Sequence, residues 1–379
     1  MHKVLFITNF QAPYRVLFFE ELGRLCDLTV AYQDKPENVT HRNIAWFNTD
    51  CHNHKIVFLK SIIRLKIKGK TIAFAPSIIG EIKKKYDYII IGDYSIVPSM
   101  IAIRYMKRHH INYIINTDGA IKKNGKGLTE KIKYYLISNA SGYLSPNSES
   151  TEYFCFYGAK KEAVFSYNFT SLKEEDIRKR ILSSPEKRRL RDELNMHISD
   201  DSKVLLSVGQ FIYRKGFDLL IIAMSKVSSS IHLYIVGGTP TEEYKKLVRD
   251  LNLKDRVHFV THQSKKEIFS YMDAADIFVH PTRKDIWGLV INEAMARGLP
   301  IITTNACGAG KTLIASENGE LIPSNNIDDL AKAINRLASS PDLDKISNSN
   351  IKKIKDYTIE NMAKRHMDIL KKLPKAYYE

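Results

Sequence analysis

Two carboxylates and a glycine lie close together in the carboxyl-terminal half, at a spacing that suits a phosphorylated sugar. In the segment HPTRKDIWGLVINEAMARGLP, Asp285 precedes Gly288 and Glu293 follows it. A helix starting near Gly288 would direct the amides of Gly288, Leu289 and Val290 at an anion, and glycine lets a phosphate approach the backbone. Asp285 and Glu293 could then accept hydrogen bonds from sugar hydroxyls. A helix cap and a surface carboxylate, without a ligand, are the plainer interpretation.

A second candidate is a basic turn bounded by glycines, in SVGQFIYRKGFDLL. Arg214 and Lys215 stand where a predicted strand passes into a predicted helix. Two cations there can neutralise a diphosphate, and the helix start adds positive potential. A solvated basic turn with no ligand explains these residues equally well.

The elements that must position these residues follow from periodicity. Short β-rich runs alternate with amphipathic helical stretches almost from end to end, which is typical of α/β folds with parallel sheets. Several of the strands end in Asn or Asp, at the sheet edge where open α/β folds bind ligands. The predicted strands are 3–9, 27–32, 87–93, 112–118, 141–147, 203–210, 231–238, 256–261, 276–282 and 300–305.

The length of 379 residues is too great for one hydrophobic core and indicates two domains. We expect an amino-terminal Rossmann-like domain over 1–170 and a second over 201–357, joined by a charged linker over 171–200. The final segment, 358–379, could cap either domain and is assigned to the first. Two tandem sheets would place their carboxyl edges across a cleft, a natural site for a two-part ligand.

Taken together, the motifs resemble a known family. The D-x(7)-E pattern from Asp285 to Glu293, followed by AMARGLPII, is similar to the E-x(7)-E signature of retaining glycosyltransferase family 4, and SVGQFIYRKGFD resembles its upstream motif. The resemblance implies the GT-B architecture, in which two tandem Rossmann-like doubly wound domains face each other across a cleft. It also implies transfer with retention at the anomeric carbon, with no metal and no cofactor other than a nucleotide diphosphate-sugar as co-substrate.

The resemblance also implies roles for single residues. Lys215, with Arg214, would contact the donor diphosphate, Glu293 the nucleotide ribose, and Asp285 the transferred sugar. Gln210 stands where many family members have an Arg, so one cation is missing from the predicted donor site. Asp285 is one methylene shorter than the usual Glu, which shifts its contact with the sugar.

In the first half, the resemblance assigns catalysis and acceptor binding. The first strand-to-helix loop, NFQAPYR, lacks the usual glycine pair but supplies Gln11 and Tyr14 for the acceptor. Asp118 ends a predicted strand where the family often has a functional His or Asp. It would stabilise oxocarbenium charge or accept the acceptor proton, unless it only forms a turn. Lys122 and Lys123 would meet an anionic acceptor or remain solvated.

The charge indicates an anionic partner. The chain holds 58 Lys or Arg against 42 Asp or Glu, a net charge of +16, and residues 1–165 carry 24 against 14. The basic and apolar run HKIVFLKSIIRLKIKGK, 54–70, could rest on anionic lipid, or form a basic loop or an edge strand.

No apolar run is long enough for a membrane span or a signal peptide, and the four cysteines show no disulfide or zinc spacing. We therefore expect a cytoplasmic protein, with the inner face of the cytoplasmic membrane as a peripheral location.

Other motifs are incomplete. NACGAGKT, 305–312, has Asn where a P-loop requires glycine, and we predict a loop there. The single D-x-D, from Asp342 to Asp344, falls between predicted helices, and neither H-E-x-x-H nor G-x-S-x-G occurs. These absences disfavour a metal site, a metalloprotease and an esterase.

The sequence thus predicts a glycosyltransferase that moves a hexose-type sugar from a UDP- or GDP-sugar to a saccharide acceptor. We expect a lipid-linked acceptor in bacterial capsule, O-antigen or lipopolysaccharide synthesis. A nucleotide-sugar epimerase or hydrolase on the same fold is one alternative. A basic nucleic-acid-binding protein is another, although no nucleic-acid-reading motif occurs and we expect no nucleic acid as partner.

Overall fold

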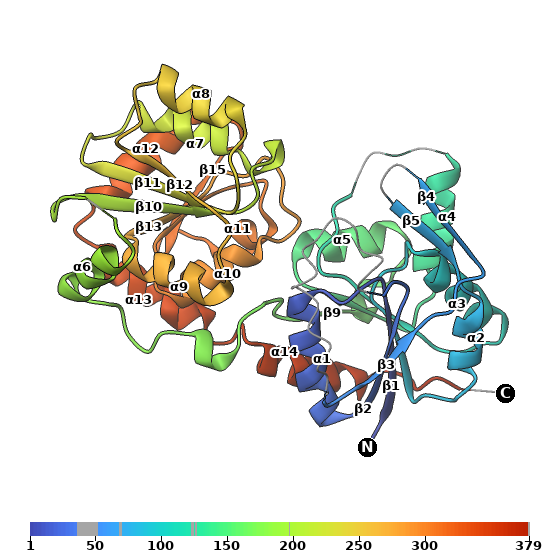
Figure 1. Ribbon diagram of the computed structural model, residues 1–379. Coiled ribbons are helices and arrows are strands. Elements are labelled where there is room, and N and C mark those ends of the chain that lie inside the picture. Colours follow the sequence, from blue (N-terminus) through green and yellow to red (C-terminus); the bar gives the residue numbers. More distant parts are fainter. Residues whose placement is uncertain (36–51, 68–69, 123–124, 126, 197, 378–379) are drawn as a thin grey trace. The chain divides into compact units, whose positions relative to one another are not determined.

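The computed structural model describes residues 1–35, 52–67, 70–122, 125, 127–196 and 198–377. The chain divides into two compact units (Figure 1). The first is Met1–Ser171 with Thr358–Glu379, and the second is Leu172–Tyr357. Each unit has its own parallel sheet with helices packed on it, so the predicted pair of Rossmann-like α/β halves is confirmed.

The first unit is built on a seven-stranded parallel sheet in the order β3-β2-β1-β6-β7-β8-β9. The central strands are apolar on both faces, as in KVLFIT and YIII, because helices cover both sides. The order reverses beside β1, which pairs with β2 on one side and β6 on the other. The strands are β1 (Lys3–Thr8), β2 (Asp27–Tyr32), β3 (Lys55–Phe58), β6 (Tyr88–Ile91), β7 (Ile114–Asn116), β8 (Gly142–Ser145) and β9 (Val164–Ser166).

The helices of the first unit are α1 (Pro13–Leu25), α2 (Ser77–Ile82), α3 (Val97–Arg108), α4 (Leu128–Ile137), α5 (Ser148–Phe156) and α14 (Ile359–Leu370). The last of them, α14, comes from the end of the chain and packs on α1. A separate antiparallel hairpin consists of β4 (Ile63–Ile67) and β5 (Lys70–Phe74). The basic run 54–70 therefore contains an edge strand, β3, and one strand of this hairpin.

The second unit holds a six-stranded parallel sheet in the order β12-β11-β10-β13-β14-β15. Its strands are β10 (Lys203–Val208), β11 (Ile231–Val236), β12 (Val257–Val260), β13 (Ile277–His280), β14 (Ile301–Thr304) and β15 (Gly319–Ile322). Its helices are α6 (Ser184–Glu193), α7 (Phe217–Met224), α8 (Glu242–Asp250), α9 (Lys265–Ala274), α10 (Leu289–Ala296), α11 (Gly308–Leu313), α12 (Ile327–Ala338) and α13 (Leu343–Ile354). The order reverses between β10 and β13, where doubly wound sheets form ligand sites at the carboxyl edge.

The charged stretch 171–200, expected to connect the domains, contributes α6 to the second unit. This helix packs on α9. Arg191 Nη2 donates to Asp276 Oδ2 at 2.7 Å, and Lys187 Nζ donates to the Ala275 carbonyl at 2.9 Å. The charges that gave this stretch the composition of a linker thus pair with buried acceptors of the second unit.

The prediction of a loop over 305–312 is wrong, because α11 begins at Gly308. The Lys311 amide donates to the Cys307 carbonyl at 3.0 Å, in the normal helical pattern. A Cβ on Gly310 would lie 2.7 Å from Thr303 Cγ2, so the small residue allows α11 to pack closely on β14. Packing therefore accounts for Gly310, which sequence pattern alone associates with phosphate binding.

Candidate functional site

The basic turn and the loop after β13 meet at the carboxyl edge of the second sheet. Lys215 ends the short 3₁₀ turn Tyr213–Lys215, and Gly216 follows it with φ +71°. A Cβ on Gly216 would lie 2.1 Å from the Pro281 carbonyl oxygen, so only glycine fits there. The Thr282 hydroxyl donates to the Arg214 carbonyl at 2.8 Å, which holds the two loops together.

Asp285 is the centre of this meeting point. Lys215 Nζ lies 2.7 Å from Asp285 Oδ2, His280 Nε2 lies 3.1 Å from the same oxygen, and Arg214 Nη1 lies 3.6 Å from Oδ1. The Asp285 amide donates to the Ala306 carbonyl at 2.9 Å, and the Asp285 carbonyl accepts from the Gly308 amide at 3.1 Å. Backbone hydrogen bonds therefore hold Asp285 against the β14–α11 connection, while its side chain forms ion pairs with Lys215 and Arg214.

The electrostatics keep Asp285 ionised and His280 neutral. Burial would raise the pKa of Asp285, but the hydrogen bond from His280 and the charge of Lys215 hold it well below its usual range. Burial, and then the positive charge of Lys215, lowers the pKa of His280. Because a carboxylate only accepts hydrogen bonds, the proton of His280 lies on Nε2. The site is a carboxylate with one buried neutral donor and two cations.

Helix α10 begins beside this cluster. Its N-cap, Gly288, has φ +98°, and a Cβ there would lie 2.8 Å from Cys307 Sγ and 3.8 Å from Asp285 Cγ. The first amides of a helix have no acceptor inside the helix, so those of Leu289 and Val290 supply positive potential beside Asp285. Glu293 lies just over one turn farther along α10, and its side chain is half-buried.

The structure thus brings together most of the residues that the sequence singled out in this half. Arg214, Lys215, Asp285 and the start of α10 share one edge of the sheet. Gln210 lies on the same strand-to-helix connection and is exposed. Two residues were missed: His280, which ends β13, and Cys307, whose Sγ lies 3.0 Å from the Trp287 carbonyl.

A second polar cluster occupies the carboxyl edge of the first sheet. Tyr14 donates its hydroxyl proton to Asp118 Oδ2 at 2.7 Å, and Arg15 donates to the same oxygen from Nε at 2.9 Å and Nη2 at 2.8 Å. Arg15 Nη1 also donates to Thr8 Oγ1 at 2.8 Å. Asp118 is therefore bound by α1 side chains. Arg15 was missed, although its place next to Tyr14 in the first turn of α1 was a usable signal.

A small cavity lies beside Asp118 and is partly closed by α14. Its lining is aromatic and polar: Phe6, Tyr14, Arg15, Phe18, Phe19, Asn116, Asp118, Tyr167, Phe169, Met362 and His366. His366 Nδ1 lies 2.8 Å from the Met362 carbonyl, so Nδ1 carries the proton, and burial lowers the pKa of His366 to about 4. Within the part of the chain that the structure describes, Asn116 Nδ2 and His366 Nε2 have no hydrogen-bond partner.

The predicted acceptor residues differ in their exposure to solvent and in their contacts. Gln11 is 1% exposed, and neither polar atom of its side chain has a hydrogen-bond partner among the described residues. Lys122 Nζ lies 3.8 Å from the ring centre of Phe156 and is exposed. Lys123 lies outside the described residues.

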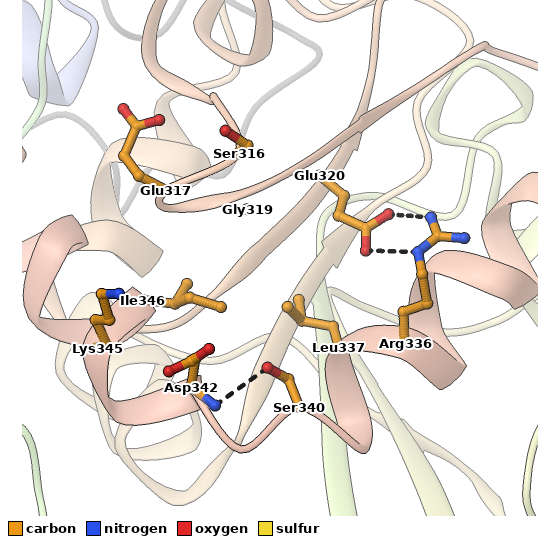
Figure 2. A pocket seen from close by; sticks show the side chains of 10 residues that line it. All are labelled: Ser316, Glu317, Gly319, Glu320, Arg336, Leu337, Ser340, Asp342, Lys345 and Ile346. Carbon is orange, nitrogen blue, oxygen red and sulfur yellow. Dashed lines mark hydrogen bonds and ion pairs between the residues drawn. The ribbon is translucent and has the colours of Figure 1, made fainter.

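A separate hollow on the second unit contains none of the predicted residues (Figure 2). It lies between the α11–β15 connection, α12 and α13, and Arg336 Nε donates to Glu320 Oε1 at 3.2 Å within it. Its charges are of both signs, and Asp342 stands at the start of α13 within it, so an anion would meet a carboxylate there and we assign the hollow no role. The lining residues are Ser316, Glu317, Gly319, Glu320, Arg336, Leu337, Ser340, Asp342, Lys345 and Ile346.

Two further observations concern the described residues only. They contain no group of three His, Cys, Asp or Glu side chains placed to hold a metal ion. None of their helices combines the length and the apolar character that a membrane span requires.

Part of the chain is similar to a known protein family. Residues 191–354 match the family model described as "Glycosyl transferases group 1". The matched segment lies within the second unit. Lys215, Asp285, Gly288 and Glu293 all lie inside the matched segment.

Curated relatives match part of the chain. An uncharacterized glycosyltransferase of Haemophilus influenzae is 32% identical over 176 residues, covering 45% of this chain and 49% of that protein. The lipopolysaccharide glucosyltransferase WaaG of Escherichia coli is 30% identical over 129 residues, 33% of this chain and 34% of the relative. The aligned part thus spans about half the length of these relatives or less.

Solved structures match the whole fold. Anabaena HepE in complex with UDP and glucose has a TM-score of 0.75 at 17% identity, covering 98% of this chain and all of that one. The structure of WaaG has a TM-score of 0.68 at 15% identity, covering 97% and 99%. These likenesses confirm the predicted GT-B fold of two Rossmann-like halves.

Proposed function

We propose that this protein is a retaining glycosyltransferase of the family 4 type. It transfers a hexose-type sugar from a UDP- or GDP-sugar to a saccharide acceptor, and it requires no metal ion. Its acceptor is lipid-linked, and it acts in bacterial surface polysaccharide synthesis at the inner face of the cytoplasmic membrane. The names of relatives that match part of the chain include a lipopolysaccharide core biosynthesis glycosyltransferase and a phosphatidylinositol monomannoside mannosyltransferase, which supports this choice of acceptor.

One observation carries the proposal: Lys215, Asp285 and the glycine start of α10 converge at one sheet edge inside the matched segment. Departure of the nucleotide diphosphate places negative charge on its phosphates. Lys215, Arg214 and the first amides of α10 would stabilise that charge. Asp285 would face the transferred sugar and Glu293 the nucleotide ribose.

Lys215 would exchange one partner for another when the donor binds. A diphosphate would compete with Asp285 for the Lys215 ammonium, which is a compact charge on a flexible stem. Asp285 would keep the hydrogen bond from His280 and would then be free on its other side to accept from a sugar hydroxyl.

The first unit would supply the acceptor side of the reaction. Asp118 would stabilise the oxocarbenium charge that develops on the sugar, or accept the acceptor proton. Gln11, Tyr14, Lys122 and Lys123 would contact the acceptor. The buried amide of Gln11 has no hydrogen-bond partner among the described residues, which supports this role because a buried polar group without a partner is costly unless a ligand satisfies it.

A ligand panel tests the donor side. UDP, GDP and their sugars are added to the full chain, and the midpoint of thermal unfolding is measured for each. A ligand at 100 times its dissociation constant stabilises the fold by about 2.7 kcal/mol. We expect one nucleotide to stabilise the protein in both its free and its sugar-bound form.

Replacement of Glu293 by Ala then tests the site itself, with Glu243→Ala on α8 as a matched control. We expect the panel response and sugar transfer to fall with the first change only. An unchanged Glu293→Ala enzyme would contradict the assignment. Donor consumption without any acceptor would instead support the epimerase or hydrolase, and salt-sensitive binding to random DNA tighter than to any nucleotide diphosphate would support the nucleic-acid-binding alternative.

A further inference from the structure

The β4–β5 hairpin of the first unit has an unusual distribution of apolar side chains. Ile63 pairs with Phe74 and Leu65 pairs with Ile72, so these four side chains share one face of the hairpin. All four are 40% to 55% exposed, and Ile62, just before β4, is 72% exposed. An antiparallel pair normally turns its apolar face inward.

The opposite face explains this orientation. It holds Ala73, which is fully buried, and Arg64, whose guanidinium pairs with the carboxylate of Asp34 two residues after β2. Arg64 Nη2 also donates to the Gln33 carbonyl at 3.4 Å. The Ile62 amide donates to the Phe74 carbonyl at 2.9 Å. The hairpin is therefore anchored through its polar and small side chains, and this anchoring turns its apolar face outward.

The adjoining surface has the same character. Helix α3 packs against both β5 and α4, and the hairpin lies apart from the main sheet, at the same end of this unit as α4 (Figure 1). On α4, Leu128 and Ile132 are exposed four residues apart, with exposed Lys131 between them. Two elements that both pack on α3 thus leave apolar side chains uncovered, which marks an interaction surface.

Charge selects the partner. Besides Arg64, which pairs with Asp34, the sequence from 60 to 74 contains four Lys and no Asp or Glu. A second copy of this chain would bring the same positive charge to the contact and be repelled. An anionic bilayer instead offers an apolar interior for the aliphatic side chains and phosphates for the cations, each cation near the surface being worth about 1 kcal/mol.

We propose that the outward face of the β4–β5 hairpin, consisting of Ile63, Leu65, Ile72 and Phe74, inserts into the headgroup region of an anionic lipid bilayer. This inference deepens the proposed function, because it specifies the surface that would bring the enzyme to a lipid-linked acceptor. The apolar side chains would enter the headgroup region, and the basic residues would favour anionic over neutral lipid.

Vesicle flotation tests the surface. The full chain is mixed with vesicles of phosphatidylcholine alone or of phosphatidylcholine with phosphatidylglycerol, and the bound fraction is measured against lipid concentration. We expect binding to the mixed vesicles and, for the variant with all four side chains changed to Ser, affinity weaker by about tenfold or more. Leu25→Ser and Leu321→Ser change exposed apolar residues elsewhere and should bind as the unchanged protein does.

Folding and donor binding are controlled separately. The four-residue variant should keep its cooperative unfolding and its response to the nucleotide diphosphate. The hairpin belongs to the first unit, whereas Lys215 and Asp285 belong to the second. If it lost cooperative unfolding, the two paired changes, Ile63→Ser with Phe74→Ser and Leu65→Ser with Ile72→Ser, would each be measured instead.

Equal vesicle binding by the folded variant and the unchanged protein would overturn the proposal. So would a concentration-dependent dimer in sedimentation experiments that the variant abolishes, because the face would then bind a second copy. A missing response to every nucleotide diphosphate would overturn the donor assignment and leave the lipid surface standing, so the two failures are distinguishable.

Discussion

The two carboxylate clusters of this protein have similar parts and different mechanics. In the first unit, Asp118 receives three hydrogen bonds on one oxygen, two of them from the nearly buried guanidinium of Arg15. In the second unit, Asp285 pairs with the Lys215 ammonium and a buried neutral histidine. Arg is a rigid planar donor, whereas Lys is a point charge on a flexible stem. We therefore expect the Asp118–Arg15 contacts to persist when ligands bind, and Lys215 to exchange Asp285 for the donor diphosphate.

The largest expected effect concerns the fixed cluster. Arg15→Ala would leave the Asp118 carboxylate half-buried without its main partner, at a cost of about 3–5 kcal/mol in the free energy of unfolding. Denaturant titration measures this cost. The exposed pair of Arg24 and Glu21 is the control, since Arg24→Ala should cost about 0.5 kcal/mol or less. Equal costs for the two changes would show that the Arg15 pair does not hold α1 against the sheet edge.

Lys215→Ala tests the exchangeable cluster. We expect sugar transfer to fall by about 10²- to 10³-fold, as for other groups that stabilise developing negative charge. Steady-state kinetics with the donor identified by the ligand panel measure the effect. Lys226→Ala removes an exposed lysine that pairs with Asp328 and should leave transfer unchanged. Normal transfer by Lys215→Ala would remove this residue from the donor site.

The pH dependence of stability separates the buried histidine of the first cluster from ordinary surface histidines. His366 has a pKa of about 4 in the folded protein against about 6.5 when unfolded, so the unfolded state binds the proton first. Its contribution to stability is therefore complete above about pH 6.5 and is lost as the pH falls toward 4, at up to about 1.4 kcal/mol per pH unit. Denaturant titrations from pH 7 to 4 measure this slope. The His366→Gln variant should show a shallower slope, because only the share of other buried histidines such as His280 remains, and an unchanged slope would assign the pH dependence to other groups.

The smallest predicted effect is a gain in affinity for the nucleotide diphosphate. Asp285→Asn keeps the shape of the side chain but removes the charge that competes for Lys215. We expect a bare nucleotide diphosphate to bind about fivefold more tightly, while sugar transfer falls. Calorimetric titration measures the affinity, and Asp118→Asn, in the fixed cluster, should leave it unchanged. Weaker binding by Asp285→Asn would mean that Asp285 supports the diphosphate instead of competing with it.

The fold was largely readable from the sequence, and its exceptions are instructive. Buried parallel strands produce long apolar runs, which marked β1, β6, β10 and β11. The predicted strands lack β4 and β5, which form the separate hairpin, and β9 and β15, which are short and lie at sheet edges; β3 was one of the alternatives for the run 54–70. The glycines of NACGAGKT suggested a loop, but Gly310 serves close helix packing that no local pattern reveals.

What the sequence determined by itself is local: the alternation of strands and helices, the glycine that starts α10, and the basic turn that ends at Lys215. Backbone preferences and side-chain periodicity act over a few residues, so they can be read directly. Only the tertiary structure decided which charges meet. Asp118 pairs with Arg15 from more than a hundred residues away, and His280 reaches Asp285 only because the chain turns back beside β14. Ion pairs depend on distances in space, which the sheet order sets and the spacing of residues along the chain does not.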